Sequence, residues 1–141
     1  MRIVLVDDEP LALRRLELSA SGLSGVEIVG IAANGRDALS VIERTRPDLV
    51  VLDVELPLID GVEVAFRLHR GAAPIVIFIT GHDEYRDEAQ NVGAFDFLLK
   101  PVRTDRLESS LRRAMSVLKA EQPAPREPGG RAQGRDPVWS T

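Results

Sequence analysis

Short aliphatic runs alternate with amphipathic segments along this chain of 141 residues. Five runs have the length of a strand and are dominated by Val, Ile and Leu, at residues 2–8, 26–32, 48–54, 74–80 and 94–100. Most of them are almost continuous in apolar residues, which is typical of strands that are covered on both faces in a parallel sheet. The pattern therefore predicts five buried strands.

A helical pattern follows each of these runs. Apolar periodicity and turn residues place the five helices at about residues 9–21, 34–46, 60–70, 83–93 and 103–122. Asp60 is a candidate N-cap of the third helix, with Glu63 in the position of a capping box. The first helix is expected to bury a face formed by Leu11, Leu13, Leu16 and Leu18. Since strand and helix alternate five times, we expect an α/β domain with helices on both faces of a parallel sheet.

The composition changes after residue 121. Residues 122–141 hold four of the nine prolines, and their only large apolar side chains are Val138 and Trp139. Such a segment cannot bury enough apolar surface to fold alone. We therefore expect a domain at residues 1–121 and a Pro/Gly-rich disordered tail or linker at 122–141. Trp139, the only tryptophan, is either solvated or docked on the domain or on a partner.

Net charge, cysteine content and the length of the apolar runs exclude several classes of function. The formal net charge of −4 argues against sequence-independent nucleic-acid binding. The absence of cysteine from the sequence excludes disulfides, thiolate nucleophiles and Cys-ligated zinc. The apolar runs are too short for a signal peptide or a membrane span. We therefore expect a cytoplasmic protein that has no membrane association and no direct nucleic-acid binding by this chain.

Polar side chains gather where the predicted strands end. Asp7 and Asp8 end the first strand, Asp53 lies near the end of the third, Thr80 ends the fourth and Lys100 ends the fifth. In an open parallel sheet these ends meet at one edge, where binding sites form. A carboxylate in an aliphatic run costs free energy unless it is paired. Asp53 is therefore expected at the rim of the sheet, beside the other acids and the lysine.

This set of groups suits a divalent cation and a phosphoryl group. Clustered carboxylates repel one another unless a cation neutralises them, and hard oxygen ligands favour Mg²⁺, with Mn²⁺ as the alternative. A metal bound by Asp8, Asp53 and a backbone carbonyl oxygen keeps positions free for phosphoryl oxygens. Lys100 can neutralise another phosphoryl oxygen, and Thr80 can donate a hydrogen bond. Asp53 is then a candidate nucleophile that forms an acyl phosphate.

Four separated motifs in this order resemble the receiver domain of two-component response regulators: VLVDDEP, LVVLDVELPLIDG, IVIFIT and FLLKP. The resemblance covers roughly residues 1–120. It implies a flavodoxin-like (βα)5 fold, with a five-stranded parallel sheet in the order 2-1-3-4-5 and helices on both faces. It also implies a phosphorelay switch that controls partner binding or dimerisation. Such a protein is not an enzyme beyond its own phosphorylation and dephosphorylation.

The resemblance implies roles for the phosphorylation site. Asp53 would accept a phosphoryl group from a histidine kinase or phosphotransfer protein, and Lys100 would pair with that group. Asp8 would bind Mg²⁺ directly, Asp7 through water, and the Glu55 backbone carbonyl would complete the protein ligands. The Glu55 side chain lies two residues beyond the acceptor, where family members tune the lifetime of the phosphoryl group.

The resemblance also implies a switch. Thr80 would move onto the phosphoryl group, and Phe97, which replaces the commoner tyrosine, would rotate inward, although it also suits a place in the core. A cis bond to Pro101 would aim the preceding lysine, and Gly81 would leave the acceptor open. His82 is expected to be a solvated loop residue beside the phosphate, at a second position that tunes phosphate lifetime.

Several alternatives stay open at this point. A homodimer through the fourth helix, fifth strand and fifth helix is expected slightly more than a monomer. Residues 81–102 look most like receivers joined to LytTR-type DNA-binding domains, but the tail is too short for such a domain. The chain is thus a stand-alone receiver, or it has lost an output domain. The rival functions are an aspartate-based phosphatase and a receiver fold that signals without phosphate.

Overall fold

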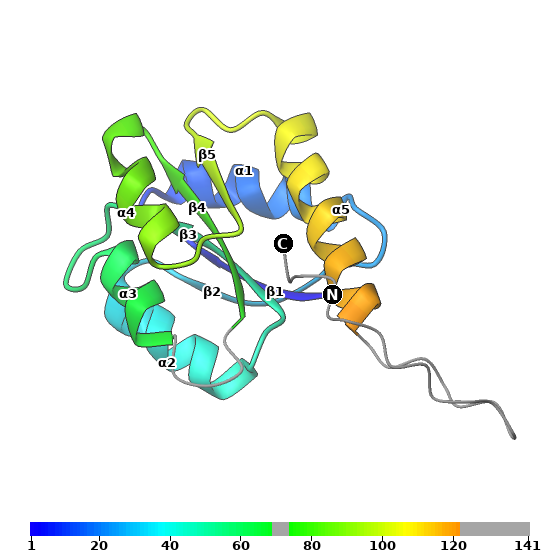
Figure 1. The fold of residues 1–141 in the computed structure, drawn as a ribbon, viewed down its shortest axis with the longest axis horizontal. Coiled ribbons are helices and arrows are strands. Elements are labelled where there is room, and N and C mark those ends of the chain that lie inside the picture. Colours follow the sequence, from blue (N-terminus) through cyan, green and yellow to red (C-terminus); the bar gives the residue numbers. More distant parts are fainter. Residues whose placement is uncertain (69–73, 122–141) are drawn as a thin grey trace, which may run out of the picture.

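The computed structural model of the protein describes residues 1–68 and 74–121. It contains one parallel sheet with the strand order β2-β1-β3-β4-β5 (Figure 1). The strands are β1 (Arg2–Val6), β2 (Glu27–Ala32), β3 (Leu49–Asp53), β4 (Ile75–Thr80) and β5 (Asp96–Leu99). The helices are α1 (Pro10–Ser21), α2 (Gly35–Thr45), α3 (Gly61–Leu68), η1 (Asp83–Tyr85), α4 (Arg86–Asn91) and α5 (Thr104–Glu121). The predicted fold and strand order are confirmed.

Two apolar clusters, one on each face of the sheet, explain the continuous aliphatic runs. Successive strand residues point to opposite faces, so Ile3 and Leu5 join one cluster while Val4 and Val6 join the other. Buried residues of α1 and α5 complete the first cluster, and those of α2, α3 and α4 complete the second. Because both faces are covered, the strands carry almost no polar side chains until they reach their ends.

The helix α1 packs through a different face from the one predicted. Leu16 and Ala20 are buried, and Leu13 packs against the same cluster, whereas Leu11 and Leu18 are exposed. At about 100° per residue, Leu11 and Leu18 lie on the side of the helix opposite to Leu16. The prediction of one face containing all four leucines was therefore wrong.

The segment predicted as one helix over residues 83–93 is divided in the structure. A single 3-10 turn, η1, precedes α4, and the Arg86 N–H donates to the Asp83 carbonyl. Ala89 is the only buried residue of α4, so apolar packing does little to impose one continuous helical period. The structure places Tyr85 and Val92 against the core at the two ends of α4 instead.

The start of α3 is as predicted, because the Glu63 N–H donates to Asp60 Oδ1 at 2.9 Å. The Glu63 side chain pairs with Arg67 one turn later, so the cap is a single hydrogen bond. The predicted end of this helix near residue 70 and the predicted tail at 122–141 lie outside the described residues. Within the described ranges, no helix is both long and apolar enough to cross a membrane.

Candidate phosphorylation site

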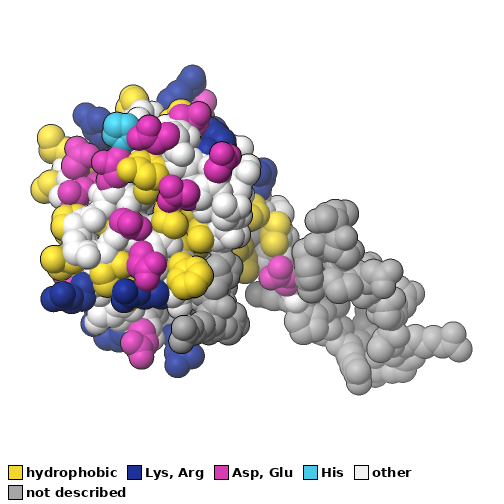
Figure 2. Space-filling view, turned by 60° about the vertical axis from the view of Figure 1, so that its left-hand side comes forward, with side chains coloured by type: hydrophobic (Ala, Val, Ile, Leu, Met, Phe, Trp, Pro, Cys, Tyr) yellow, Lys and Arg dark blue, Asp and Glu magenta, His cyan; other side chains and the backbone are white. Residues whose placement is uncertain are grey.

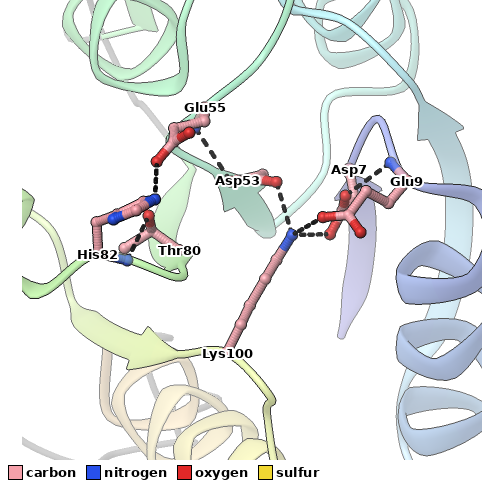
Figure 3. A network of polar contacts seen from close by, with 7 residues as sticks. All are labelled: Asp7, Glu9, Asp53, Glu55, Thr80, His82 and Lys100. Atoms are coloured by element: carbon pink, nitrogen blue, oxygen red, sulfur yellow. Dashed lines mark hydrogen bonds and ion pairs between the residues drawn. The ribbon is translucent and has the colours of Figure 1, made fainter.

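Three strand ends bring Asp7, Asp53 and Lys100 together (Figure 3). Asp53 is the last residue of β3, Asp7 follows β1, and Lys100 follows β5. The Lys100 Nζ atom lies 2.9 Å from Asp53 Oδ2 and 2.9 Å from Asp7 Oδ2. Asp53 is only 3% exposed and Asp7 is fully buried. The structure brings the three side chains together, but the two acids lie below the rim expected for Asp53, where the lysine compensates for their burial.

The loop after β3 fixes the orientation of Asp53. The Glu55 N–H donates to Asp53 Oδ1 at 3.0 Å, and the Gly61 N–H donates to the Val54 carbonyl at 2.7 Å. A Cβ atom on Gly61 would collide with the Asp53 carbonyl oxygen. The loop can close this tightly only because residue 61 has no side chain. The glycine of the LVVLDVELPLIDG motif therefore helps to position Asp53.

The connection after β5 positions Lys100. The Lys100 N–H donates to the Thr80 carbonyl at 2.8 Å, and the peptide bond to Pro101 is cis. The amine reaches across the ends of the strands and also lies 3.2 Å from Glu9 Oε1. Lys100 is thus surrounded by three carboxylates, and it is their common partner (Figure 3).

Burial and charge set the ionisation of this cluster. Burial raises the pKa of Asp53 to about 6, and the neighbouring charge of Asp7 adds to this effect, while the hydrogen bond from Lys100 opposes it. Burial alone would lower the pKa of Lys100, but its contacts with Asp53 and Asp7 outweigh burial and raise it. The lysine is therefore charged at neutral pH, and the Asp53 carboxyl loses its proton less readily than an exposed aspartate.

The acids at this edge fit a divalent cation. Carboxylate oxygens of Asp7, Asp8, Glu9 and Asp53 all lie within 4.8 Å of one another. Asp7 Oδ2 is buried and receives no hydrogen bond, since its contact with Lys100 is an ion pair alone. Oxygen-only ligands in an open arrangement suit Mg²⁺ and Mn²⁺.

Sequence reasoning missed Glu9. It is the third acid of the run Asp7-Asp8-Glu9, and it holds the N-cap position of α1. The Glu9 N–H donates to Asp7 Oδ1 at 2.9 Å, which turns the chain back over the carboxylate. This acidic run directly before a helix-starting proline was the signal that could have identified it. The Glu55 backbone carbonyl as a metal ligand stays a prediction.

Thr80, Gly81 and His82 form the opposite side of the site. Thr80 is buried, and its Oγ1 accepts the His82 N–H at 3.2 Å. His82 Nε2 lies 3.1 Å from Glu55 Oε1, and both side chains are about half exposed (Figure 3). A Cβ atom on Gly81 would meet nothing within 4 Å, so the space beside Thr80 is open, as expected. His82 is solvated, but it also contacts the loop after β3. Acidic side chains lie beside the histidine on the face that Figure 2 shows.

Phe97, the predicted switch aromatic, is a buried residue of the sheet. It lies within β5, is 8% exposed and belongs to the same core cluster as Ala89 of α4. The guanidinium of Arg86 lies over its ring, with 4.7 Å from Cζ to the ring centroid. In this structure the aromatic side chain is therefore already covered.

Comparison with known proteins assigns the family. The sequence profile of the response regulator receiver domain matches residues 3–112. The chain is 45% identical over 116 residues to the positive alginate biosynthesis regulatory protein of Pseudomonas aeruginosa, covering 81% of this chain and 47% of that protein. It is 40% identical over 113 residues to the transcriptional regulatory protein BtsR of Salmonella typhi, covering 80% and 47%.

A solved structure agrees with these sequence matches. The response regulatory domain of protein mrkE from Klebsiella pneumoniae superposes with a TM-score of 0.81 at 31% identity, covering 86% of this chain and all of that domain. The chain spans about half the length of the curated relatives it matches. Fold, strand-end chemistry and sequence similarity together show that the chain belongs to the response regulator receiver domain family of two-component systems.

Proposed function

We propose that Asp53 is the phospho-acceptor of this receiver. A histidine kinase or a phosphotransfer protein would supply the phosphoryl group in a Mg²⁺-dependent reaction. The observation that carries the proposal is the Lys100 amine, 2.9 Å from both Asp53 and the buried Asp7. A carboxylate, a fixed cation and a cluster of hard oxygen ligands together are what phosphoryl transfer to an acid requires.

The chemistry follows from these positions. A carboxylate oxygen of Asp53 attacks phosphorus and forms a P–O bond, while the P–N bond of the donor phosphohistidine breaks and its electron pair leaves with the imidazole. A divalent cation held by Asp7, Asp8, Asp53 and the Glu55 carbonyl would neutralise charge on the phosphoryl oxygens. Lys100 then exchanges its contact with the Asp53 carboxylate for a phosphoryl oxygen. Since the leaving group is activated, no histidine base is needed in the receiver.

Thr80 and Phe97 would pass the change to the surface. The Thr80 hydroxyl oxygen now accepts the His82 N–H, and it would turn to donate to a phosphoryl oxygen at the open space beside Gly81. A change at the end of β4 would be passed to Phe97 through the pairing of β4 with β5, in which Phe78 and Phe97 are partners in register. The β5 surface with α4 and α5 on either side would then alter binding to a partner or to a second copy.

The output of the whole protein is a further proposal. Two relatives carry names of regulators, one of alginate biosynthesis and one of transcription, and each is about twice as long as the matched region. We propose that this receiver, in the cytoplasm, acts on output through another domain or a partner. Direct nucleic-acid binding by this chain is not expected, given its net charge of −4.

The test is mass spectrometry after incubation with acetyl phosphate and Mg²⁺. Wild-type protein should gain about 80 Da, the mass of one phosphoryl group, and chelation of the metal should prevent the gain. Asp53→Asn should abolish labelling. Asp60→Asn is the matched control, because it removes an acid from the same loop while asparagine keeps the helix cap. An unchanged wild-type mass, under conditions that label another receiver, would refute the proposal.

A further inference from the structure

The three carboxylate partners of Lys100 differ in how freely they can move. The amine lies 2.9 Å from an oxygen of Asp53 and of Asp7, and 3.2 Å from Glu9 Oε1. The side chains of Asp7 and Asp53 are 0% and 4% exposed, whereas that of Glu9 is 68% exposed. Glu9 is therefore the partner that can follow the amine without disturbing the packed interior.

The two buried carboxylates have few oxygens to spare for the lysine. Asp7 Oδ1 already accepts the Glu9 N–H at 2.9 Å, and Asp53 Oδ1 accepts the Glu55 N–H at 3.0 Å. The Oδ2 atoms of both acids contact Lys100 instead. A divalent cation bound by these acids would compete with the amine for their oxygens, and the two positive charges repel each other.

Glu9 is free to take over the amine. It holds the N-cap position of α1, but its side chain makes no hydrogen bond to the start of that helix. The helix therefore does not need this carboxylate. A pocket of about 450 Å³ between α1 and the chain after β5 is lined by both Glu9 and Lys100, so the amine has room to approach Glu9.

We propose that Glu9 is a positioning residue, which holds the Lys100 amine at the site while a divalent cation occupies Asp7 and Asp53. This inference rests on the proposed function and deepens it. Without Glu9, the amine would turn into solvent when the cation binds. With Glu9, its charge stays beside the position that a phosphoryl group would enter, so less reorganisation is needed when that group arrives.

Nitrogen NMR of the lysine amines tests the proposal directly. The sequence contains one other lysine, the exposed Lys119 near the end of α5, which serves as the internal reference. Without Mg²⁺, Lys100 should give a sharp amine signal in both wild type and Glu9→Gln, because Asp7 and Asp53 hold it. With Mg²⁺, wild type should keep this signal, and Glu9→Gln should lose it through rapid hydrogen exchange with water.

Glu55→Gln is the matched control for the loss of a carboxylate charge near Asp53. The Glu55 side chain is 49% exposed and pairs with His82, and the substitution keeps the backbone carbonyl. This variant should retain the Lys100 signal in Mg²⁺. Loss of the signal in both variants, or in neither, would overturn the inference. A general structural defect would also change the spectrum without Mg²⁺, which Glu9→Gln should not do.

A double-mutant cycle tests whether Glu9 acts through the lysine. In calorimetric titration, Glu9→Gln should weaken Mg²⁺ binding by about two- to fivefold, as the size of one exposed ion pair implies. In a Lys100→Met background the same substitution should weaken binding less, because no amine remains to be held. An equal or larger loss in that background would show that Glu9 acts on the cation directly, and it would overturn the inference.

Beryllofluoride, a mimic of the phosphoryl group, separates this inference from the proposed function. Added with Mg²⁺, it gives Lys100 a new partner, so the amine signal of Glu9→Gln should return. Wild type that binds neither Mg²⁺ nor beryllofluoride would refute the proposed function together with this inference. Wild type that binds both, with a Lys100 signal that Glu9→Gln leaves unchanged in Mg²⁺, would refute the inference alone.

Discussion

At the scale of single residues, Asp53 is a carboxyl group that is costly to ionise. Its pKa is raised from 3.8 to about 6, first by burial and then by Asp7. The folded state therefore keeps a proton that the unfolded chain has already lost. Without Mg²⁺, the free energy of unfolding should fall as pH rises from about 4 to about 6, by up to about 3 kcal/mol.

Urea denaturation in a chelating buffer measures this dependence. Asp53→Asn should lose this part of the pH dependence and exceed the stability of wild type at pH 7. Added Mg²⁺ should raise the stability of wild type at pH 7 more than that of the variant. A wild-type stability in chelator that increases over the same pH window, with no difference from Asp53→Asn, would contradict the expectation.

Leu58 carries backbone strain in the loop that follows Asp53. Its φ is 71°, a left-handed conformation that a leucine adopts at a cost, and the residue is 66% exposed. Leu58→Asn should increase the free energy of unfolding by about 0.5 to 1 kcal/mol, because asparagine tolerates this conformation and little packing is lost. Thermal denaturation reports the change. Leu58→Ala, which keeps the backbone strain, should show no comparable gain.

The residues of the site differ in how far sequence could predict them. Asp7, Asp53 and Lys100 follow aliphatic runs, and parallel strands must bring such ends together. Glu9 has only the weaker signal of an acidic run before a proline, and its contact with Lys100 depends on a side chain that reaches across from the N-cap of α1. Arg86 has no sequence signal, because its contact with Phe97 depends on a side chain that reaches across from α4. The burial of Asp7 and Asp53 could not be predicted either, since the sequence shows where a strand ends but not how deeply the neighbouring loops cover that end.

At the scale of elements, Asp96 fixes β5 to α5. Its carboxylate accepts hydrogen bonds from both Arg106 Nη atoms at 3.0 Å and from the Ser110 hydroxyl at 2.7 Å. It also forms an ion pair with Arg113. Burial would raise the pKa of Asp96, but the hydrogen bonds from Arg106 and Ser110 outweigh it and lower the pKa. Asp96 thus stabilises the fold above its unfolded pKa near 4, and this contribution is lost as pH falls further.

Asp96→Asn should therefore lower the free energy of unfolding at pH 7 by about 2 kcal/mol, the usual cost of breaking a partly buried charged hydrogen-bond network. The free energy of unfolding should be measured with urea, because guanidinium chloride is a salt and would screen the ion pairs. The difference from wild type should shrink as pH falls below 4. A difference that is the same at pH 3 and pH 7 would show that the carboxylate charge does not carry the effect.

The strands and helices that bury the most apolar surface were predicted most accurately from the sequence. Each strand run was found within about two residues, because a strand covered on both faces is a nearly continuous aliphatic run that stops at polar or turn residues. The polar segment at residues 83–93 was placed correctly but not divided, since Ala89 alone anchors α4. The same weak anchoring makes η1 and α4 the part most easily displaced. This is the segment that the proposed switch requires to move.

At the scale of the molecule, the apolar side chains that stabilise the fold form two clusters on the faces of the sheet, whereas the charged groups of the site lie at one edge of it. The clusters draw on α1 and α5 on one face and on α2, α3 and α4 on the other. The charged groups of the site lie at the strand ends outside both clusters, although Val54 and Leu56 of the loop after β3 belong to the second cluster. Substitutions at the site can therefore alter ionisation and metal binding while the sheet stays intact, which makes the variants above interpretable.

The last prediction concerns the extent of the domain. The buried residues of both clusters end at Ala114, and α5 ends at Glu121. Residues 122–141 contain only two large apolar side chains, Val138 and Trp139, which are too few to extend the core. A chain ending after Glu121 should therefore unfold at the urea midpoint of the full chain and accept a phosphoryl group at the same rate.

Trp139 provides the control, because it is the only tryptophan and reports on this segment alone. If residues 122–141 are a solvated tail, tryptophan emission of the full chain should match free tryptophan in water and stay unchanged through the unfolding transition of the domain. A blue-shifted emission that is lost together with the fold, accompanied by a lower midpoint for the shortened chain, would instead place Trp139 against the domain and extend the folded unit beyond residue 121.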